Sequence, residues 1–247
     1  MGVKTANNKN ACVSYYRDEA TAYDDKRFSC RCATIYNEIQ QHIVYEYLKK
    51  CHTVLDAGTG TGRFALYLAR QGIDIVAIDS SKEMLMEAKK KARADENGRR
   101  ISFIVADIEH LPFNSSVFDG ICSIHVLVHF RDINEIVGEF SRVLKINGSL
   151  AVDIPSKIIS EPYAFVARML GTITYRDYFR TTKSIQNIFE KFSFQLCRKI
   201  KIKKMPRIIP HFFVCKLKMK KVGTLLQNFE TKYNWGSTSI AQALKVE

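Results

Sequence analysis

The sequence predicts an α/β protein with one mostly parallel sheet that is covered by helices on both faces. Two observations predict this fold class. Short apolar runs alternate with amphipathic helical patterns through the middle of the 247-residue chain. A glycine-rich turn over residues 58–62 directly follows the first apolar run and leads into a helix. Strand–helix–strand units of this kind form right-handed crossovers and place their strands parallel in one sheet.

The individual elements follow in a regular order after a helical segment at residues 1–50. Strands are expected at 52–58, 73–79, 100–107, 118–127 and 149–154, and helices at 62–72, 80–93 and 133–145. Gly72 can end the first of these helices, and an Asn147–Gly148 turn is expected to lead into the fifth strand. Capping-box spacing predicts helix starts at Ser80 with Glu83 and at Asp132 with Glu135. Two further strands are expected within "KFSFQLCRKIKIKK" and "STSIAQALKV".

Composition limits the class of protein. Hydrophobic residues make up 46% of the chain, enough for the core of a single domain, and no apolar stretch is long enough for a membrane helix. The seven cysteines are scattered without a C-x-x-C pair, and Cys30-Arg31-Cys32 alone cannot complete a zinc site. We therefore expect free thiols in a reducing cytoplasm and no metal.

The net charge of +13 is concentrated near the end of the chain. No acidic residue occurs between Lys191 and Phe229, whereas eleven lysines and arginines do. This basic part could contact RNA phosphates or an anionic membrane surface, or it could be a solvated face.

The turn "VLDAGTGTGRF" (residues 54–64) predicts a ligand close to the backbone, because glycine lacks a Cβ and tolerates positive φ. A dinucleotide is not favoured, since the third position of the G-x-G-x-x-G pattern is Arg63. A P-loop is excluded because no G-K-[ST] follows. Asp56 beside the turn would repel a phosphate, but it could order the turn and pair with an ammonium group. The ligand indicated therefore has an amino acid end.

Four segments together resemble class I S-adenosylmethionine (SAM)-dependent methyltransferases. They are "VLDAGTGTGRFALYLAR", "IVAIDSSKEMLMEAKKKA", "FIVADIEHLPFNSSVFDGICSIHVLVHF" and "EFSRVLKINGSLAVDIP". The resemblance covers about residues 50–155 and is nearest to the small-molecule branch of ubiquinone and menaquinone biosynthesis. It implies a Rossmann-like, doubly wound seven-stranded sheet in a single domain. The domain would comprise an N-terminal helical lid (1–50), a SAM-binding core (51–155), a helical substrate-cap insertion (156–183) and a basic C-terminal part (184–247) that completes the sheet.

The resemblance also implies a set of cofactor-binding residues. Asp79 would bind the ribose hydroxyls and Asp107 the adenine of SAM, whose product is S-adenosylhomocysteine. The full expected set is Asp56, Ala57, Gly58, Thr59, Gly60, Gly62, Asp79, Ser80, Met84, Asp107, Ile108 and Ser123, with Tyr15 and Tyr23 from the lid. The family's usual proline and double glycine are replaced by Ile146 to Ser149, outside the cofactor motifs.

The implied reaction is in-line transfer of the SAM methyl group to an O, N or C atom of a small acceptor, such as a quinone, a lipid-like molecule or a specialised metabolite. A general base is needed only if the attacking atom loses a proton. His125 and His129 follow the fourth strand and are the candidates, because histidine titrates near neutral pH. In the insertion, Tyr163, Tyr175 and Tyr178 are candidates for contact with an apolar or ring-bearing acceptor.

Two other readings stay open beside small-molecule methylation. An RNA or tRNA methyltransferase would use the basic segment at 191–221 to hold phosphates. A non-catalytic SAM-binding protein would keep the cofactor motifs without transfer. The absence of an appended RNA-binding module disfavours the first, and the intact cofactor motifs give the second no particular support.

Overall fold

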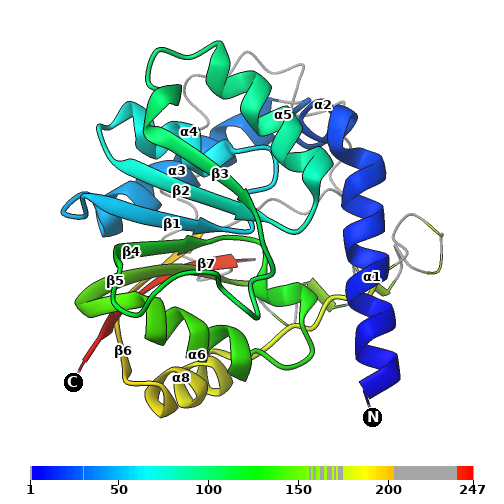
Figure 1. Cartoon of the computed structure of the whole chain (residues 1–247). Coiled ribbons are helices and arrows are strands. Elements are labelled where there is room, and N and C mark those ends of the chain that lie inside the picture. The colour runs from blue at the N-terminus through cyan, green and yellow to red at the C-terminus, as the bar shows by residue number, and fades with distance from the viewer. Residues whose placement is uncertain are drawn as a thin grey trace.

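The structure is a computed structural model that describes residues 2–29, 31–155, 175–202 and 238–246, with single residues 157, 160, 161, 164, 165, 169 and 171 between them. Within these residues seven strands form one sheet (Figure 1). The strands are β1 (Thr53–Ala57), β2 (Asp74–Asp79), β3 (Ile101–Val105), β4 (Phe118–Ser123), β5 (Leu144–Pro155), β6 (Phe194–Ile202) and β7 (Thr238–Lys245).

The helices flank the sheet. They are α1 (Gly2–Glu19), α2 (Tyr23–Phe28), α3 (Arg31–Leu48), α4 (Arg63–Arg70), α5 (Lys82–Arg93), α6 (Asn134–Val143) and α8 (Thr182–Lys191). Three short 3-10 turns are η1 (Ala20–Ala22), η2 (Gly98–Arg100) and η3 (Leu127–His129).

The sheet has the order β3-β2-β1-β4-β5-β7-β6. Strands β1 to β5 pair in parallel, and β7 pairs antiparallel with both β5 and β6. The chain reverses its direction of strand addition after β3, so the switch point lies between β1 and β4. Ligands of such sheets bind outside the carboxyl ends of the strands at this point. The predicted α/β class with a mostly parallel sheet is therefore confirmed.

Two hydrophobic clusters fill the space between the sheet and its helices. One face packs on α6 and α8 through residues such as Phe140 and Phe189. The other face packs on α3 and α4 through residues such as Leu48 and Leu68. Helices cover both faces because the parallel strands are apolar on both sides.

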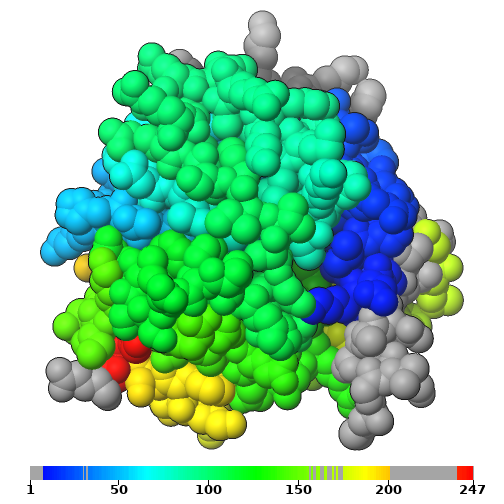
Figure 2. Space-filling model, in the orientation of Figure 1, coloured from blue at the N-terminus to red at the C-terminus, as the bar shows by residue number. Residues whose placement is uncertain are grey.

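The N-terminal helix lies apart from these two layers. In Figure 1, α1 (blue) stands beside the carboxyl ends of β2 and β3, and Figure 2 shows its atoms directly against those of the core. Contacts from α1 reach Asp107 after β3 and His129 in η3. The helix therefore covers the end of the sheet at which a ligand is expected.

The predicted N-caps of two helices lie one residue before the observed ones. The N-cap of α5 is Ser81, whose hydroxyl accepts from the Met84 N–H at 3.2 Å, and not Ser80. The predicted cap Asp132 lies outside α6, where its carboxylate accepts from the Asn134 N–H at 2.9 Å. At α5 two serines are adjacent, so the spacing alone could not choose between them, whereas at α6 the predicted Asp132 still accepts from the first N–H of the helix.

The fifth strand also differs from its prediction. It begins at Leu144, before the expected Asn147–Gly148 turn, and Asn147 has a φ of 62° within it. The pairing with β4 shifts between Phe118 and Gly120, so the extra residues form an irregularity inside the strand.

Other expectations concern parts of the chain that are described only in part. Tyr163 and most of the insertion at 156–174, and residues 203–221 of the basic segment, lie outside the described residues. Cys12, Cys51, Cys122 and Cys197 are free thiols. No helix among the residues that the structure describes is long and apolar enough to cross a membrane.

Candidate functional site

The glycine-rich turn is anchored to the second strand and open on its other side. The N–H groups of Gly58 and Thr59 both donate to the carbonyl of Ile78, at 2.9 Å each. Gly58, Gly60 and Gly62 have φ of 78°, 56° and 78°, a region that glycine adopts without strain. A Cβ placed at Gly60 would meet no atom within 4 Å, so this side of the turn can admit a ligand close to the backbone.

Asp79 at the end of β2 lies beside the open side of the turn. Its Oδ2 accepts from the Gly60 N–H at 2.8 Å, and its Oδ1 accepts from the Ser81 N–H at 2.9 Å. Burial raises the pKa of Asp79, and the two hydrogen bonds to the charged form oppose this shift. The carboxylate is thus held in one orientation between the turn and the start of α5.

Asp56 at the end of β1 orders the turn from beneath. It is only 2% exposed, and its Oδ2 accepts from the Thr59 hydroxyl at 2.6 Å. Burial raises the pKa of Asp56 to about 6. Asp56 thus orders the turn through Thr59, as predicted. Its contact with an ammonium group of a ligand stays a prediction.

Asp107 follows β3 and faces the N-terminal helix. Its Oδ2 lies 2.6 Å from Lys9 Nζ, which also pairs with Glu109. Burial raises the pKa of Asp107, but Lys9 and the Glu109 N–H outweigh it, so the pKa lies below its ordinary value. The acid expected at the adenine is therefore charged and paired with α1.

His129 is held at both ring nitrogens. Its Nδ1 lies 2.8 Å from Asp177 Oδ1, and its Nε2 lies 3.2 Å from the Tyr16 hydroxyl, which is 3.0 Å from the Tyr175 hydroxyl. Burial lowers the pKa of His129, but Asp177 and its other partners outweigh this and raise the pKa to about 10. A protonated ring has no lone pair for a substrate proton, so this arrangement favours a structural role.

The same contacts tie the lid to the core. Asn8 of α1 donates to the carbonyls of His129 and Arg176, and its Oδ1 accepts from the Arg176 N–H at 2.8 Å. The Tyr178 N–H donates to the Val128 carbonyl at 2.6 Å. The N-terminal helix, η3 and the end of the insertion (residues 175–178) thus meet in one cluster.

His125 follows β4 and contacts a carboxylate of the neighbouring strand. Its backbone N–H donates to Asp153 Oδ1 at 2.8 Å, and its Nδ1 lies 3.0 Å from Asp153 Oδ2. The side chain is 39% exposed, whereas that of Asp153 is 1% exposed. His125 also has a φ of 63°, which non-glycine residues seldom adopt.

Arg63 at the start of α4 connects the turn to α3. Its guanidinium donates to Asn37 Oδ1 at 2.6 Å and to Gln40 Oε1 at 3.1 Å. It also lies over the rings of Phe28 and Phe64, 5.5 and 4.3 Å from their centroids. Burial lowers the pKa of Arg63. This arginine is therefore an internal cation close to the switch point.

The other residues predicted for cofactor binding fall into three groups. Met84, Ser123, Ile108 and Thr59 are buried, and Ser123 donates to the Ala57 carbonyl at 3.1 Å. Ser80 is exposed and follows Asp79 directly. Tyr15 packs edge-on against Tyr16 and Tyr175, and the ring centroids of Tyr23 and Tyr16 are 6.0 Å apart. Both therefore belong to the aromatic group around His129, Tyr16 and Tyr175, here called the lid cluster.

Of the tyrosines predicted for the acceptor, two can be placed. Tyr175 is buried in the lid cluster against His129, and Tyr178 lies under the guanidinium of Arg176. Tyr163 lies outside the described residues.

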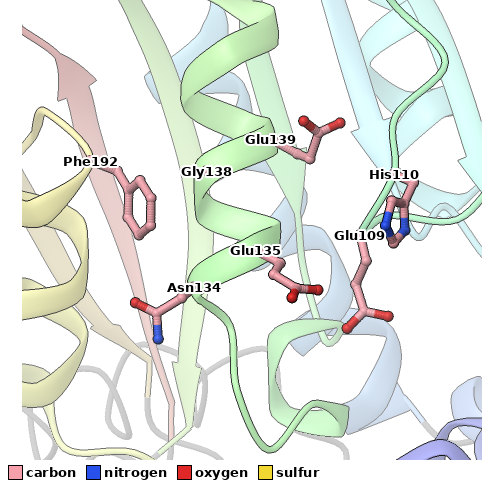
Figure 3. A pocket seen from close by; sticks show the side chains of 7 residues that line it. All are labelled: Glu109, His110, Asn134, Glu135, Gly138, Glu139 and Phe192. Carbon is pink, nitrogen blue, oxygen red and sulfur yellow. The ribbon is translucent and has the colours of Figure 1, made fainter.

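A separate hollow lies along α6. Figure 3 shows Phe192 on one side of Gly138 and three carboxylates on the other; the lining residues are Glu109, His110, Asn134, Glu135, Gly138, Glu139 and Phe192. Glu109 is already paired with Lys9, and Glu139 pairs with Arg142. Among the residues described, no three His, Cys, Asp or Glu side chains are grouped to hold a metal ion. We assign no site here.

Three residues of the cluster at the carboxyl ends were missed in the sequence. Asp153 was read only as part of a strand, and Gln40 and Asp177 only as parts of a helix and of the insertion. A parallel neighbour of β4 should bring an acid at its own carboxyl end next to His125, and this signal could have identified Asp153.

The comparison with protein families shows which kind of domain holds this site. A family model described as a methyltransferase domain matches residues 55–152. This segment holds the turn, Asp79, Asp107, both histidines, all of β4 and the part of β5 up to Val152. Residues 55–152 belong to a class I SAM-dependent methyltransferase domain. SAM is the methyl donor of this family, and the open turn and the fixed Asp79 fit such a ligand.

Two curated relatives of this segment are methyltransferases that are named for their substrates. The chain is 31% identical over 146 residues to a malonyl-[acyl-carrier protein] O-methyltransferase of Hamiltonella defensa, covering 57% of this chain and 50% of that protein. It is 37% identical over 101 residues to a demethylmenaquinone methyltransferase of Thermus thermophilus, covering 40% and 45%. The matched segments span half or less of the length of these relatives.

Solved structures extend the likeness of the fold beyond the matched segment. The methyltransferase in a complex with the Trm112 activator from Haloferax volcanii superposes with a TM-score of 0.64 at 18% identity, covering 94% of this chain and 98% of that one. At this identity the likeness concerns the fold.

Proposed function

We propose that this chain transfers a methyl group from SAM to an O, N or C atom of a small-molecule acceptor. The proposal rests on one observation. The carboxylate of Asp79 accepts a hydrogen bond from Gly60 at the open side of the turn, and both residues lie in the segment that the methyltransferase family model matches. Bound SAM would supply an activated methyl group on its sulfonium.

The chain's own residues have three tasks in this reaction. The turn at residues 58–62 would hold the methionine end, Asp79 the ribose hydroxyls and Asp107 the adenine. The N-terminal helix, fixed by Lys9 and His129, would exclude water from the site. Alignment and desolvation are the main protein contributions to such a transfer.

A small acceptor is favoured because the chain resembles a protein named as a demethylmenaquinone methyltransferase. The aromatic lid cluster at the carboxyl ends also suits an apolar or ring-bearing molecule. The basic segment that an RNA substrate would need lies mostly outside the described residues.

The test has two stages. Titration calorimetry with S-adenosylhomocysteine should give saturable one-to-one binding, and absence of binding would overturn the proposal. Labelled SAM should then be offered with three acceptors in parallel: a short-chain demethylmenaquinol, malonyl-pantetheine and bulk tRNA. Label in a small organic product supports the proposal, whereas label in tRNA alone would replace it with the RNA alternative. Binding without transfer to any acceptor would favour a non-catalytic protein.

A further inference from the structure

Strand β3 lies at one border of the sheet, where part of its backbone faces outward. Its neighbour among the described strands is β2 (Figure 1). The Ala106 N–H donates to the Asp79 carbonyl at 3.1 Å, and in a parallel ladder every second residue of a strand bonds to its neighbour. The N–H and C=O groups of Phe103 and Val105 therefore point away from β2. Within the part of the chain that the structure describes, these groups have no hydrogen-bond partner.

The side chains of β3 are partly uncovered as well. Residues 106–117, all of which the structure describes, connect β3 to β4 without a helix. Ser102 and Ile104 lie on the face that a crossover helix would cover; both are exposed, Ile104 by 36%. On the other face, Val105 is 56% exposed beside the half-buried Phe103. The strand thus presents apolar side chains on both faces of an open edge.

The opposite border of the sheet shows how an edge is kept free. Strand β6 carries Arg198, Lys199 and Lys201, and its pairing with β7 shifts between Leu196 and Arg198. Charged side chains and such irregularities prevent another strand from pairing with an edge. By contrast, β3 contains no charged residue and no proline, and its register with β2 is unbroken. Of the two borders, β3 is therefore the one suited to pair with a further strand.

The two ends of β3 carry opposite charges. Arg99 and Arg100 precede the strand. Asp107 and Glu109 follow it. Arg100 already has an ion-pair partner, whereas Arg99 is exposed and has none among the described residues. Lys9 is shared by Asp107 and Glu109, so one negative charge is left at that end. An antiparallel second copy of β3 would join unlike charges at both ends, and a parallel copy would join like charges.

One antiparallel register uses all of the free backbone groups of Phe103 and Val105. If Ile104 lies opposite Ile104 of the second copy, each Phe103 lies opposite a Val105. Residues paired in this way exchange both N–H···O bonds, so the two Phe103–Val105 pairs form four hydrogen bonds. Each exposed Val105 then packs on an aromatic ring, which is a favourable cross-strand pair. Five residues before and five after Ile104, the same register sets Arg99 opposite Glu109.

We propose that β3 pairs antiparallel with β3 of a second copy of this chain, which gives a two-fold symmetric dimer with one continuous sheet. Both copies contribute the same surface, as such symmetry requires. A contact between two short strands is small, so we expect reversible association in the micromolar range and not a permanent dimer. The inference goes beyond the proposed function and does not depend on it.

Sedimentation velocity of the full chain, from low-micromolar to submillimolar concentration, measures the association. The wild-type protein should change from monomer to dimer as the concentration rises. Ile104→Lys should stay monomeric, because two ammonium groups would face each other at the two-fold axis. Ile200→Lys, at a similarly exposed isoleucine of β6, is the matched control and should dimerise like the wild type. A monomeric wild-type protein, or an undiminished dimer in Ile104→Lys, overturns the proposal.

An exchange of charges tests the antiparallel orientation. Arg99→Glu alone and Glu109→Arg alone each place like charges at both ends of the dimer and should weaken the association by about tenfold. An equimolar mixture of the two variants should form a heterodimer with the wild-type affinity, because both of its ends again join unlike charges. A mixture that associates no more tightly than either variant alone contradicts the pairing.

Disulfide formation tests the register. Ile104→Cys places two thiols directly opposite each other in a pair without hydrogen bonds, with Cα atoms about 4.5 Å apart, which a disulfide can bridge. Oxidation in air should give a cross-linked dimer on a non-reducing gel, in excess of any from the wild type. Ser102→Cys lies on the same face opposite Ala106 of the second copy, and should add no cross-link. Equal cross-linking in both variants, or none in either, refutes this register.

Discussion

Lys9 Nζ lies 2.6 Å from Asp107 Oδ2, and this ion pair joins the N-terminal helix to the carboxyl end of β3. The two side chains are 31% and 40% exposed, so solvent weakens their attraction. Asp107 is also the acid expected at the adenine of SAM. The ammonium group of Lys9 therefore pairs with the carboxylate oxygen of Asp107 that an amino group of the cofactor would use.

We predict that Lys9→Met tightens the binding of S-adenosylhomocysteine. Removing the competing ammonium frees Asp107 for the ligand, and a partly exposed pair is worth up to about 1 kcal/mol, or roughly fivefold in affinity. Titration calorimetry measures the change. Lys26→Met, which removes an exposed partner of Glu19, is the matched control and should leave the affinity unchanged. Weaker binding in Lys9→Met would show that the lysine contacts the ligand itself.

Asp79→Asn should weaken the same ligand strongly. The carboxylate is held by Gly60 and Ser81 in the orientation expected for the ribose hydroxyls. Loss of charged hydrogen bonds costs about 1.5–3 kcal/mol, which corresponds to roughly 10–150-fold in Kd. Asp74→Asn changes an exposed acid at the start of the same strand and serves as the control. An unchanged Kd in Asp79→Asn contradicts the motif assignment.

Two glycines that both have a positive φ can test whether the ligand approaches the glycine-rich turn. Gly60 and Gly72 have φ of 56° and 88°, and a Cβ at either would meet no protein atom within 4 Å. An alanine at each position should therefore cost a similar 1–2 kcal/mol or so of stability from backbone strain. Only Gly60→Ala should also lower the affinity for S-adenosylhomocysteine, by about tenfold or more, because its Cβ enters the open side of the turn.

Thermal unfolding and calorimetry on both variants separate the two effects. Equal affinity in Gly60→Ala and Gly72→Ala would mean that the ligand does not approach the turn.

The lid cluster predicts a loss of stability at alkaline pH. The pKa of His129 is raised to about 10 in the folded protein, well above its ordinary value of 6.5. A raised histidine pKa contributes stability that is fully present below pH 6.5 and is lost as pH rises to about 10. We expect urea unfolding to show a decrease of a few kcal/mol across this window.

The partner of His129 supplies the control for this pH dependence. Asp177→Asn removes the acid 2.8 Å from the ring, so most of the decrease should disappear in this variant. His52→Asn should keep the wild-type profile. A wild-type slope in Asp177→Asn would mean that another group is responsible.

Much of the fold could be predicted because the strands from β1 to β5 carry continuous apolar runs with polar residues at their ends. The acids Asp56, Asp79 and Asp107 each follow or end a strand, and the parallel pairing brings them to one edge of the sheet. Periodicity determines these elements locally, so no long-range information is needed.

The exact register that sets Asp153 beside His125 could not be predicted in the same way. The offset between paired residues is 26 at Phe118 and Leu144 but 29 at Gly120 and Ser149, because β5 contains an irregularity. Counting along a regular strand would misplace Asp153 relative to His125. The contact of Lys9 with Asp107 spans 98 residues of sequence and depends on tertiary packing of α1, for which the sequence contains no local signal.

The place of β7 in the sheet has a consequence for how the protein is made. This strand lies between β5 and β6 and is the only described partner of β6. Residues 194–202 therefore cannot join the sheet until residues 238–245 have left the ribosome. The cofactor half, from β3 to β5, can form its pairings earlier in synthesis. We thus expect β5 to be a temporary sheet edge, which a chaperone or another chain could contact, until residues 238–245 have emerged.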